Sequence, residues 1–476
     1  MSGDDILAMS GARLARLYAH RALSPVEVTD RVLRRIEQRN PTINAFCLVL
    51  AESALQEARA SERRWAAGAP LSALDGVPVS IKDLFLTRGA RTAKGSRPWA
   101  DYLPDTDSPV VQRLRAAGTV AVGKTTTPEF GWKGVTDSPL EGVTTNPWDT
   151  SKTAGGSSGG AAAALAGLMA PLAVGSDAGG SIRIPASYCG VVGHKPSLGR
   201  VPVWPASATE MLSVAGPMTR TVEDAALLLD VLAGPHPRDH MALPPDPARP
   251  YAAHVQADVR GRRVAWVAAP GDASVAPDVA ARVAQARGAF EALGCVVEDA
   301  AFPLDGMAEV FEVLWACGRA TAADGLTAAQ VGQFDPDLRQ LITAAAGYSG
   351  ADVMRALLRR AEYAAAAHAF MARYDALICP TMPTTAFAAG VIAPHRPQGW
   401  QAPEGGERVL WLWWTPFTYP FNLTGQPAIS VPCGLGDDGL PVGLQIVGQR
   451  FDDAGVLALA AAFERAVPAW AASYPV

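Results

Sequence analysis

The segment from residue 150 to residue 193 constrains the fold most, because glycine-rich turns alternate there with apolar runs. Residues 150–160 (TSKTAGGSSGG) predict a loop that runs into an alanine-rich helix over 161–168. Residues 172–193 predict a strand, a second glycine turn and the start of another helix. Strands that alternate with helices in this way favour an α/β fold built on one large mixed sheet.

The same alternation continues along the chain. Residues 74–84 (LDGVPVSIKDL) predict a turn that leads into a short apolar strand. A helix over 277–293 between two strands predicts a β-α-β unit, and a later Gly-Asp-Asp-Gly turn predicts a hairpin. Further strands are expected at 118–122, 263–269, 295–300, 427–433 and 441–447.

The chain is expected to form a single domain. Its 476 residues are 49% hydrophobic and 18% charged, which gives ample material for a core. No segment has the composition of an interdomain linker, so we predict one α/β domain whose mixed, twisted sheet is covered by helices on both faces. Residues 1–70 are expected to form a helical arm packed on the core, which residues 71–476 would build. Ser24, Pro25 and Glu27 predict a helix start with a capping box in this arm.

Composition excludes several classes of function. The net charge of −5, without charged blocks, argues against a surface for nucleic acids or anionic membranes. The six cysteines are far apart and form no C-x-x-C pair, which favours reduced thiols over a zinc site or a disulfide framework. The N-terminal MSGDDILAMS has no signal-peptide pattern, and the most apolar stretch, 161–174, is too short to span a bilayer. We therefore expect a soluble, cytoplasmic enzyme that is a monomer or homodimer.

Three short motifs match known functional patterns only formally. GTVAVGKT (118–125) matches a phosphate-binding loop, but its middle residues have the pattern of a strand. GGSSG (155–159) matches a nucleophile elbow, but the residues before it are polar and turn-like. HPRDH (236–240) resembles a metal-binding pair, but it lies in a proline-rich loop without helical spacing. We disfavour all three interpretations.

A fourth pattern joins three distant segments. Lys82 lies in an apolar strand, where burial would favour the neutral amine and hence a base. The tandem serines Ser157 and Ser158 lie in the Gly/Ser-rich loop, and Ser181 follows Gly179–Gly180. These two glycines allow successive backbone N–H groups to point toward one site, as an oxyanion hole requires. Together the segments predict nucleophilic catalysis by a serine.

The segments GGSSGG, GSDAGGSIRIPASYCGVVGHKPSLGRV and GPMTRTVEDAALLLDVLAG follow one another along the chain. In this order they closely resemble the amidase signature family, and the similarity extends from SPVEVTDRVLRRI to GLPVGLQIVGQRFDD. The departures are small: Ala178 stands where threonine or isoleucine is more usual, and His194 where a hydrophobic residue is common. The resemblance implies a signature core over 75–235 and a variable helical region on the substrate side over 300–375.

The resemblance implies an amidase that works through an acyl-enzyme. Ser181 would be the nucleophile, and Ser157 would relay its proton to neutral Lys82. The peptide bond from Gly156 to Ser157 is expected to be cis. No metal or organic cofactor is implied.

Other residues of the signature are expected to support this triad. Ser158 would assist it, and Asp177 and Arg183, which bracket the second glycine turn, would hold the shape of that turn. The expected oxyanion hole consists of the backbone N–H groups of Ala178, Gly179, Gly180 and Ser181.

The substrate is less constrained than the reaction. The resemblance places Gly131 and Trp132 in the cleft, although a core position suits Trp132 equally. Trp204 and Trp414 belong to a group of aromatic residues that favours an apolar or aryl amide, with burial in the core as the alternative for Trp414.

Other substrates and roles stay open. An aryl carbamate or ester is one alternative. A glutaminase-type chain of an amidotransferase, which needs a partner, is another, disfavoured because residues 345–360 (AAGYSGADVMRALLRR) lack the usual GYYDAYY-like segment. A non-catalytic binding role is also possible.

Overall fold

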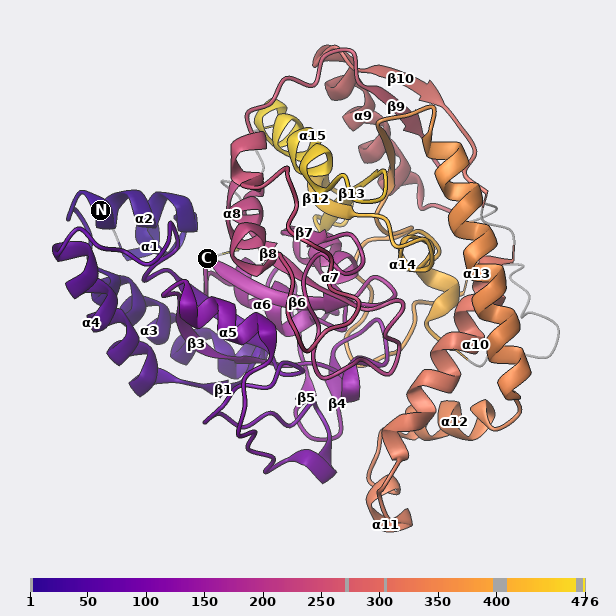
Figure 1. The fold of residues 1–476 in the computed structure, drawn as a ribbon, viewed down its shortest axis with the longest axis horizontal. Helices are drawn as coiled ribbons and strands as arrows, with labels where there is room; N and C mark the ends of the chain where they lie inside the picture. Colours follow the sequence, from indigo (N-terminus) through magenta and orange to yellow (C-terminus); the bar gives the residue numbers. More distant parts are fainter. Residues whose placement is uncertain (1–2, 270–273, 304–305, 397–408, 468–473, 476) are drawn as a thin grey trace.

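The fold is built on one large sheet. In the computed structural model, which describes residues 3–269, 274–303, 306–396, 409–467 and 474–475, eleven strands form a mixed sheet in the order β1-β3-β2-β6-β8-β7-β12-β13-β11-β9-β10 (Figure 1). These strands are β1 (Phe46–Val49), β2 (Pro78–Lys82), β3 (Val120–Thr125), β6 (Leu172–Asp177), β7 (Val192–Lys195), β8 (Val214–Thr219), β9 (Arg263–Trp266), β10 (Val296–Asp299), β11 (Ala376–Pro380), β12 (Ala428–Leu435) and β13 (Pro441–Gly448). Two short strands, β4 (Asp137–Ser138) and β5 (Gly142–Val143), pair separately.

Helices cover both faces of this sheet (Figure 1). In β11, Ala376 and Ile378 belong to one hydrophobic core and Leu377 and Cys379 to the other, because alternate residues of a strand face opposite sides. The predicted α/β domain, with a mixed sheet covered on both faces, is therefore confirmed. The described α-helices are α1 (Gly3–Leu7), α2 (Gly11–Ala19), α3 (Pro25–Ile43), α4 (Ala51–Ala66), α5 (Pro109–Ala116), α6 (Gly159–Ala166), α7 (Arg183–Cys189), α8 (Val222–Leu232), α9 (Pro277–Ala292), α10 (Met307–Ala320), α11 (Ala328–Val331), α12 (Pro336–Ala345), α13 (Gly350–Met371), α14 (Pro420–Leu423) and α15 (Asp453–Ala466).

The centre of the sheet brings distant segments to one edge. β2 lies between β3 and β6 and runs parallel to both. Lys82 ends β2 and Asp177 ends β6, so the two residues lie at the same edge of the sheet. The loop after β6 carries Ser181, and hydrogen bonds described below bring Ser157 to the same place.

Two local predictions are confirmed in detail. β9 and β10 pair in parallel with α9 between them in sequence, which is the β-α-β unit expected from the alternating pattern. β12 and β13 pair antiparallel across the Gly-Asp-Asp-Gly turn, which is the expected hairpin.

The N-terminal arm departs from the sequence-based expectation in two ways. It contains β1, which extends the main sheet by pairing antiparallel with β3. Ser24 caps α3 by accepting a hydrogen bond from the Val26 N–H at 3.0 Å, but its hydroxyl donates to Glu62. Glu27 pairs with Arg31 at 3.1 Å, so the predicted capping box is wrong. Glu27 instead forms an i,i+4 ion pair with Arg31, which contributes about 0.2–0.5 kcal/mol on a helix surface.

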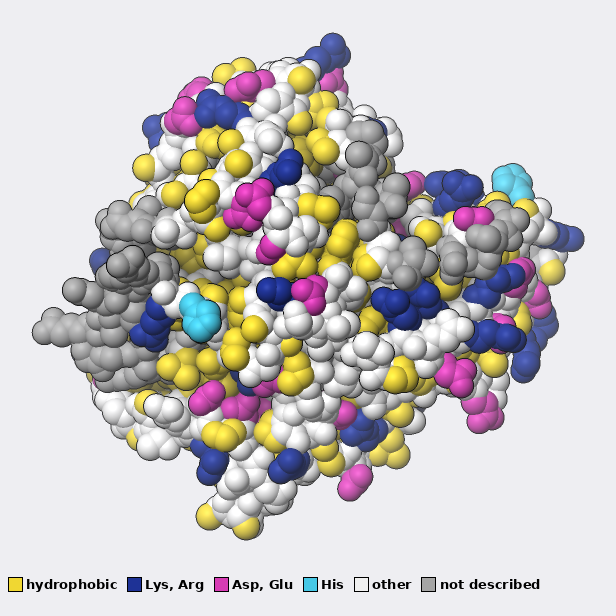
Figure 2. All heavy atoms as spheres, turned by 180° about the vertical axis from the view of Figure 1, so that it is seen from behind, with side chains coloured by type: hydrophobic (Ala, Val, Ile, Leu, Met, Phe, Trp, Pro, Cys, Tyr) yellow, Lys and Arg dark blue, Asp and Glu magenta, His cyan; other side chains and the backbone are white. Residues whose placement is uncertain are grey.

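The surface carries charges of both signs. Figure 2 shows the basic and acidic side chains of one face interspersed over most of it. None of the helices in the described residues is long and apolar enough to cross a membrane.

Candidate active site

The Lys82 amine contacts three serine hydroxyl groups. Its side chain is fully buried at the end of β2. Its Nζ lies 2.7 Å from the Ser157 Oγ, 2.9 Å from the Ser158 Oγ and 3.1 Å from the Ser176 Oγ. Burial lowers the pKa of Lys82 well below its usual value, against an opposing effect of the Asp177 charge. A lysine in this environment favours the neutral amine, which can accept a proton.

Ser157 is positioned by a close approach of backbone segments. The Gly156–Ser157 peptide bond is cis. A Cβ on Gly156 would lie 2.5 Å from the Val135 backbone, so only glycine fits at this position. A Cβ on Gly131, which has a φ of +69°, would lie 3.1 Å from the Ser157 Oγ. The segment around Gly131 therefore faces the Ser157 hydroxyl directly, with no side chain between them.

Ser181 lies in the turn between β6 and α7, next to the tandem serines. The Ser158 N–H donates a hydrogen bond to the Ser181 carbonyl at 3.1 Å, which joins the two loops. The Ser181 hydroxyl makes no hydrogen bond to any residue in the described part of the chain. Its side chain is 7% exposed and lines the same cavity as Ser157.

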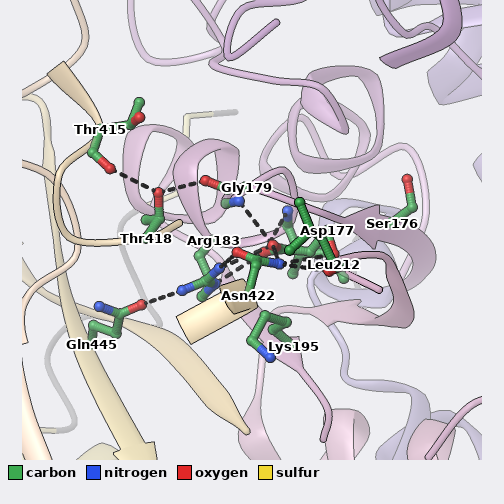
Figure 3. A network of polar contacts seen from close by, with 12 residues as sticks. Ser176, Asp177, Gly179, Arg183, Lys195, Leu212, Thr415, Thr418, Asn422 and Gln445 are labelled. Atoms are coloured by element: carbon green, nitrogen blue, oxygen red, sulfur yellow. Dashed lines mark hydrogen bonds and ion pairs between the residues drawn. The ribbon is translucent and has the colours of Figure 1, made fainter. Parts of the chain in front are cut away.

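A buried polar network holds the turn after β6 in shape (Figure 3). Arg183 donates to both carboxylate oxygens of Asp177, at 3.0 Å and 2.9 Å, and Asn422 donates to one of them at 2.9 Å. Burial alone would raise the pKa of Asp177, but the Arg183 guanidinium and the Asn422 amide lower it to about 2. Arg183 is held in turn by Gln445 at 2.7 Å. Asp177 and Arg183 are thus joined to each other across the turn, and Asp177 also accepts hydrogen bonds from the Gly180 and Ile182 N–H groups.

The geometry of the turn corrects one predicted role. The Gly180 N–H donates to the Asp177 Oδ1 at 2.8 Å, so it is not free to bind an oxyanion. The Gly179 carbonyl accepts a hydrogen bond from the Thr418 Oγ1 at 2.7 Å (Figure 3). The N–H groups of Gly179 and Ser181 have no partner among the described residues. The sequence could not show which N–H groups are free, because this depends on the position of the Asp177 carboxylate in the folded turn.

A cavity of about 330 Å³ opens at this edge of the sheet. Predicted site residues Gly131, Ser157, Ala178, Ser181 and Trp204 all line it. The lining is otherwise mixed and includes Leu84, Phe85, Lys94, Phe130, Ser176, Pro205, Arg319 and Asp324.

Trp132 and Trp414 do not line this cavity and are corrected here. Each is 1% exposed and belongs to the second hydrophobic core. Trp414 stacks on Tyr188 with ring centroids 6.3 Å apart. The Trp132 carbonyl accepts a hydrogen bond from the Trp315 Nε1 at 3.2 Å. Both therefore occupy the core positions that the sequence left open as alternatives.

Two residues of the site escaped the sequence analysis. Ser176 is the third hydroxyl on Lys82, and its only signal was its place in the GSDAGG segment, directly before Asp177. Arg319 lines the cavity from the last turn of α10, in an alanine-rich helix that offered no local motif.

The formal matches to other motifs have structural explanations. Lys124 lies in β3, fully buried, 3.0 Å from the Asp83 carboxylate, and donates to the Phe85 carbonyl at 3.0 Å. This lysine therefore holds the interior together and is not part of a phosphate-binding loop. His236 contacts Gln112 at 3.1 Å. The described residues contain no group of three or more His, Cys, Asp or Glu side chains that could hold a metal ion.

Replacing Lys124 with alanine is expected to destabilise the fold. The substitution leaves the buried Asp83 carboxylate without its cation, which should lower the free energy of unfolding by about 3–5 kcal/mol. Urea denaturation followed by circular dichroism measures this change. Arg13→Ala, which removes an exposed charge, serves as the control and should change little. Unchanged stability in Lys124→Ala would contradict the structural role.

Comparison with known proteins finds similar chains over almost the whole length of this one. The family model described as Amidase matches residues 27–457. An acylamidase from Rhodococcus erythropolis is 39% identical over 481 residues, which cover 100% of this chain and 98% of that protein. A chain of the glutamyl-tRNA(Gln) amidotransferase from Myxococcus xanthus is 38% identical over 483 residues, covering 95% of each protein.

A solved structure is similar over almost the whole fold. The crystal structure of a bacterial aryl acylamidase of the amidase signature family matches with a TM-score of 0.89 and 30% sequence identity, covering 98% of this chain and 99% of that chain. Sequence and structure thus agree from end to end. The chain belongs to the amidase signature family and is an amide-hydrolysing enzyme.

Proposed function

We propose that this enzyme hydrolyses amides through an acyl-enzyme on Ser181, with Ser157 and Lys82 as its proton relay. The observation that carries the proposal is the fully buried Lys82 amine, surrounded by three serine hydroxyls at the rim of the cavity that Ser181 lines. A neutral amine has one lone pair and can accept one of these contacts as a hydrogen bond from a hydroxyl.

The reaction proceeds in two balanced halves. The Ser181 Oγ bonds to the amide carbonyl carbon, while its proton passes through the Ser157 hydroxyl to the Lys82 Nζ. The C–N bond then breaks as the relay returns this proton to the leaving nitrogen. Water attacks the ester in the second half, its proton follows the same relay, and the carboxylic acid leaves as Ser181 regains its proton.

The oxyanion of the tetrahedral intermediate needs donors that are free before the reaction begins. The N–H groups of Gly179 and Ser181 meet this condition, whereas the Gly180 N–H donates to Asp177. We therefore assign the oxyanion hole to Gly179 and Ser181, with Ala178 at its rim. Where it has been measured, the removal of one such donor raises the activation barrier by about 3 kcal/mol.

An amide with an apolar or aryl portion is the proposed substrate. Leu84, Phe85, Phe130 and Trp204 give the cavity apolar and aromatic walls. The similarity to an acylamidase and to an aryl acylamidase supports this class. An aryl carbamate or ester could use the same relay.

A glutaminase role is the second candidate. It is favoured by the glutamyl-tRNA(Gln) amidotransferase chains that occur among the relatives, at 34–38% identity. Such an enzyme would turn over glutamine, and it would need a partner protein.

A panel of substrates separates these candidates. We expect the purified enzyme to hydrolyse an acyl p-nitroanilide and not glutamine. An aryl carbamate and a primary aliphatic amide should be hydrolysed at intermediate rates. Chromogenic release of nitroaniline and enzymatic detection of ammonia measure the two reactions. Turnover of glutamine alone would contradict the aryl amide proposal and favour the amidotransferase role.

A further inference from the structure

Arg319 presents a buried and incompletely bonded cation to the active-site cavity. The residue is 6% exposed and lies in the last turn of α10. Its Nη1 donates to the Phe130 carbonyl at 2.8 Å and its Nη2 to the Thr209 Oγ1 at 3.1 Å. Its Nε is buried and has no hydrogen-bond partner in the described residues. Two neutral acceptors therefore satisfy only two of the five N–H groups of this guanidinium.

No counter-charge balances Arg319 in the described part of the chain. None of the carboxylates there forms an ion pair with it, whereas the buried Arg183 is paired with Asp177. Arg319 instead packs over the Trp315 ring at 4.2 Å. Burial lowers the pKa of Arg319 to about 10, so the group keeps its charge at neutral pH. A buried cation is costly unless an anion compensates it.

The charged residues that line the cavity leave it with an excess of positive charge. They are Lys94, Arg319 and Asp324. Asp324 is exposed, so solvent screens its charge more than that of the buried Arg319. The cavity therefore favours an anionic group near Arg319.

Arg319 lines the same cavity as Ser157 and Ser181, so one small molecule can contact all three residues. Its partner Phe130 directly precedes Gly131, whose Cβ position lies 3.1 Å from the Ser157 Oγ. Covalent geometry along this path limits the separation of the guanidinium and the Ser157 Oγ to about 11 Å.

We propose that Arg319 is the binding site for a carboxylate on the substrate, so that the preferred substrates are amides bearing a carboxylate near the scissile bond. The kinetic test of this proposal rests on the proposed hydrolytic function. A carboxylate matches the planar fork of a guanidinium and supplies the charge that the protein does not.

Matched substrate pairs test this specificity. Glutaryl p-nitroanilide is compared with pentanoyl p-nitroanilide, and 4-acetamidobenzoate with 4-methylacetanilide, so the charge is placed on either side of the amide. Arg319→Gln should lower kcat/KM roughly 10- to 100-fold for the charged member of at least one pair. The neutral member, which lacks the carboxylate, should lose less, so that the ratio of the two kcat/KM values falls about tenfold or more. The control variant Arg16→Gln removes an exposed arginine that is distant from Arg319 in the sequence, and it should preserve the preference for the charged substrate.

Equal losses for charged and neutral substrates in Arg319→Gln would overturn the proposal, since they would show that Arg319 only holds the Phe130 carbonyl. A wild-type enzyme that prefers the neutral member of both pairs would overturn it as well. Arg319→Lys keeps the charge without the fork and should recover part of the preference.

A binding measurement separates this proposal from the hydrolytic one. Calorimetric titration with glutarate uses Ser181→Ala and the double variant that adds Arg319→Gln, and it needs no turnover. Binding that weakens about tenfold or more in the double variant supports the carboxylate site even if no amide is hydrolysed. Equal binding to both proteins overturns it even if hydrolysis depends on Ser181.

Discussion

Replacing Ser181 with alanine is expected to lower kcat for amide hydrolysis by about 10⁴-fold or more. The substitution removes the oxygen that would bond to the carbonyl carbon and leaves the rest of the cavity unchanged. Because the Ser181 hydroxyl bonds to no described residue, its loss leaves no buried partner unsatisfied. The free energy of unfolding should therefore change by less than about 1 kcal/mol.

Ser187→Ala is the matched control for this prediction. Ser187 lies in α7, is also buried, and accepts a hydrogen bond from the Gly443 N–H at 3.1 Å. Its removal should reduce stability and leave kcat nearly unchanged. Mass spectrometry after reaction with an acyl p-nitrophenyl ester should locate the acyl group on the peptide containing Ser181. An adduct on Ser157, or activity retained in Ser181→Ala, would contradict the assignment.

Replacing Lys82 with methionine should reduce kcat by about 10³-fold or more at neutral pH. Methionine has a similar length and keeps the site filled, but it cannot accept the proton that Ser157 passes on. In the wild-type enzyme, kcat/KM should rise with pH until the Lys82 amine is neutral, and it should level off below pH 10.5 because burial lowers this pKa. A rise of the same shape in Lys82→Met would assign the titration to another group.

Stability gives an independent measure of the protonation of Lys82. In the unfolded chain this lysine keeps its proton up to a pKa of 10.5, whereas the buried amine loses it at lower pH. Between these values unfolding takes up a proton, so stability rises with pH by up to about 1.4 kcal/mol per unit. Lys82→Met lacks this contribution. The free energy of unfolding of the wild type, relative to that of the variant, should therefore increase as pH rises toward 10.5. Urea denaturation between pH 7 and 9 measures it, and parallel curves would mean that folded Lys82 is protonated.

Local patterns predicted most of the fold. The hairpin of β12 and β13 followed from two apolar runs around a Gly-Asp-Asp-Gly turn. The β-α-β unit of β9, α9 and β10 followed from the change in apolar periodicity. These elements depend on contacts between neighbouring segments, which the sequence displays directly. β1 was missed, although β10 has the same length, because the helical patterns on both sides of it dominated the expectation for residues 1–70.

The candidate site was partly predictable for a different reason. Lys82, Ser157 and Ser181 lie in segments whose apolar or glycine-rich surroundings make a polar side chain conspicuous. Trp132 was placed in the cleft by the family resemblance and Trp414 by the density of aromatic residues around it, although an aromatic side chain suits a core equally well. Composition cannot distinguish these two environments, and only packing does.

The sequence by itself determined the β-α-β unit, the hairpin, where the two glycine-rich turns lie and which polar side chains those turns carry. It did so because propensity, turn chemistry and apolar period act over a few neighbouring residues. Tertiary structure alone decided that Ser176 joins Ser157 on Lys82, that Asp177 takes the Gly180 N–H, and that Arg319 reaches the cavity without a described acidic partner. These contacts join residues brought together by the parallel strands and by α10, and their energies depend on burial that no local pattern encodes.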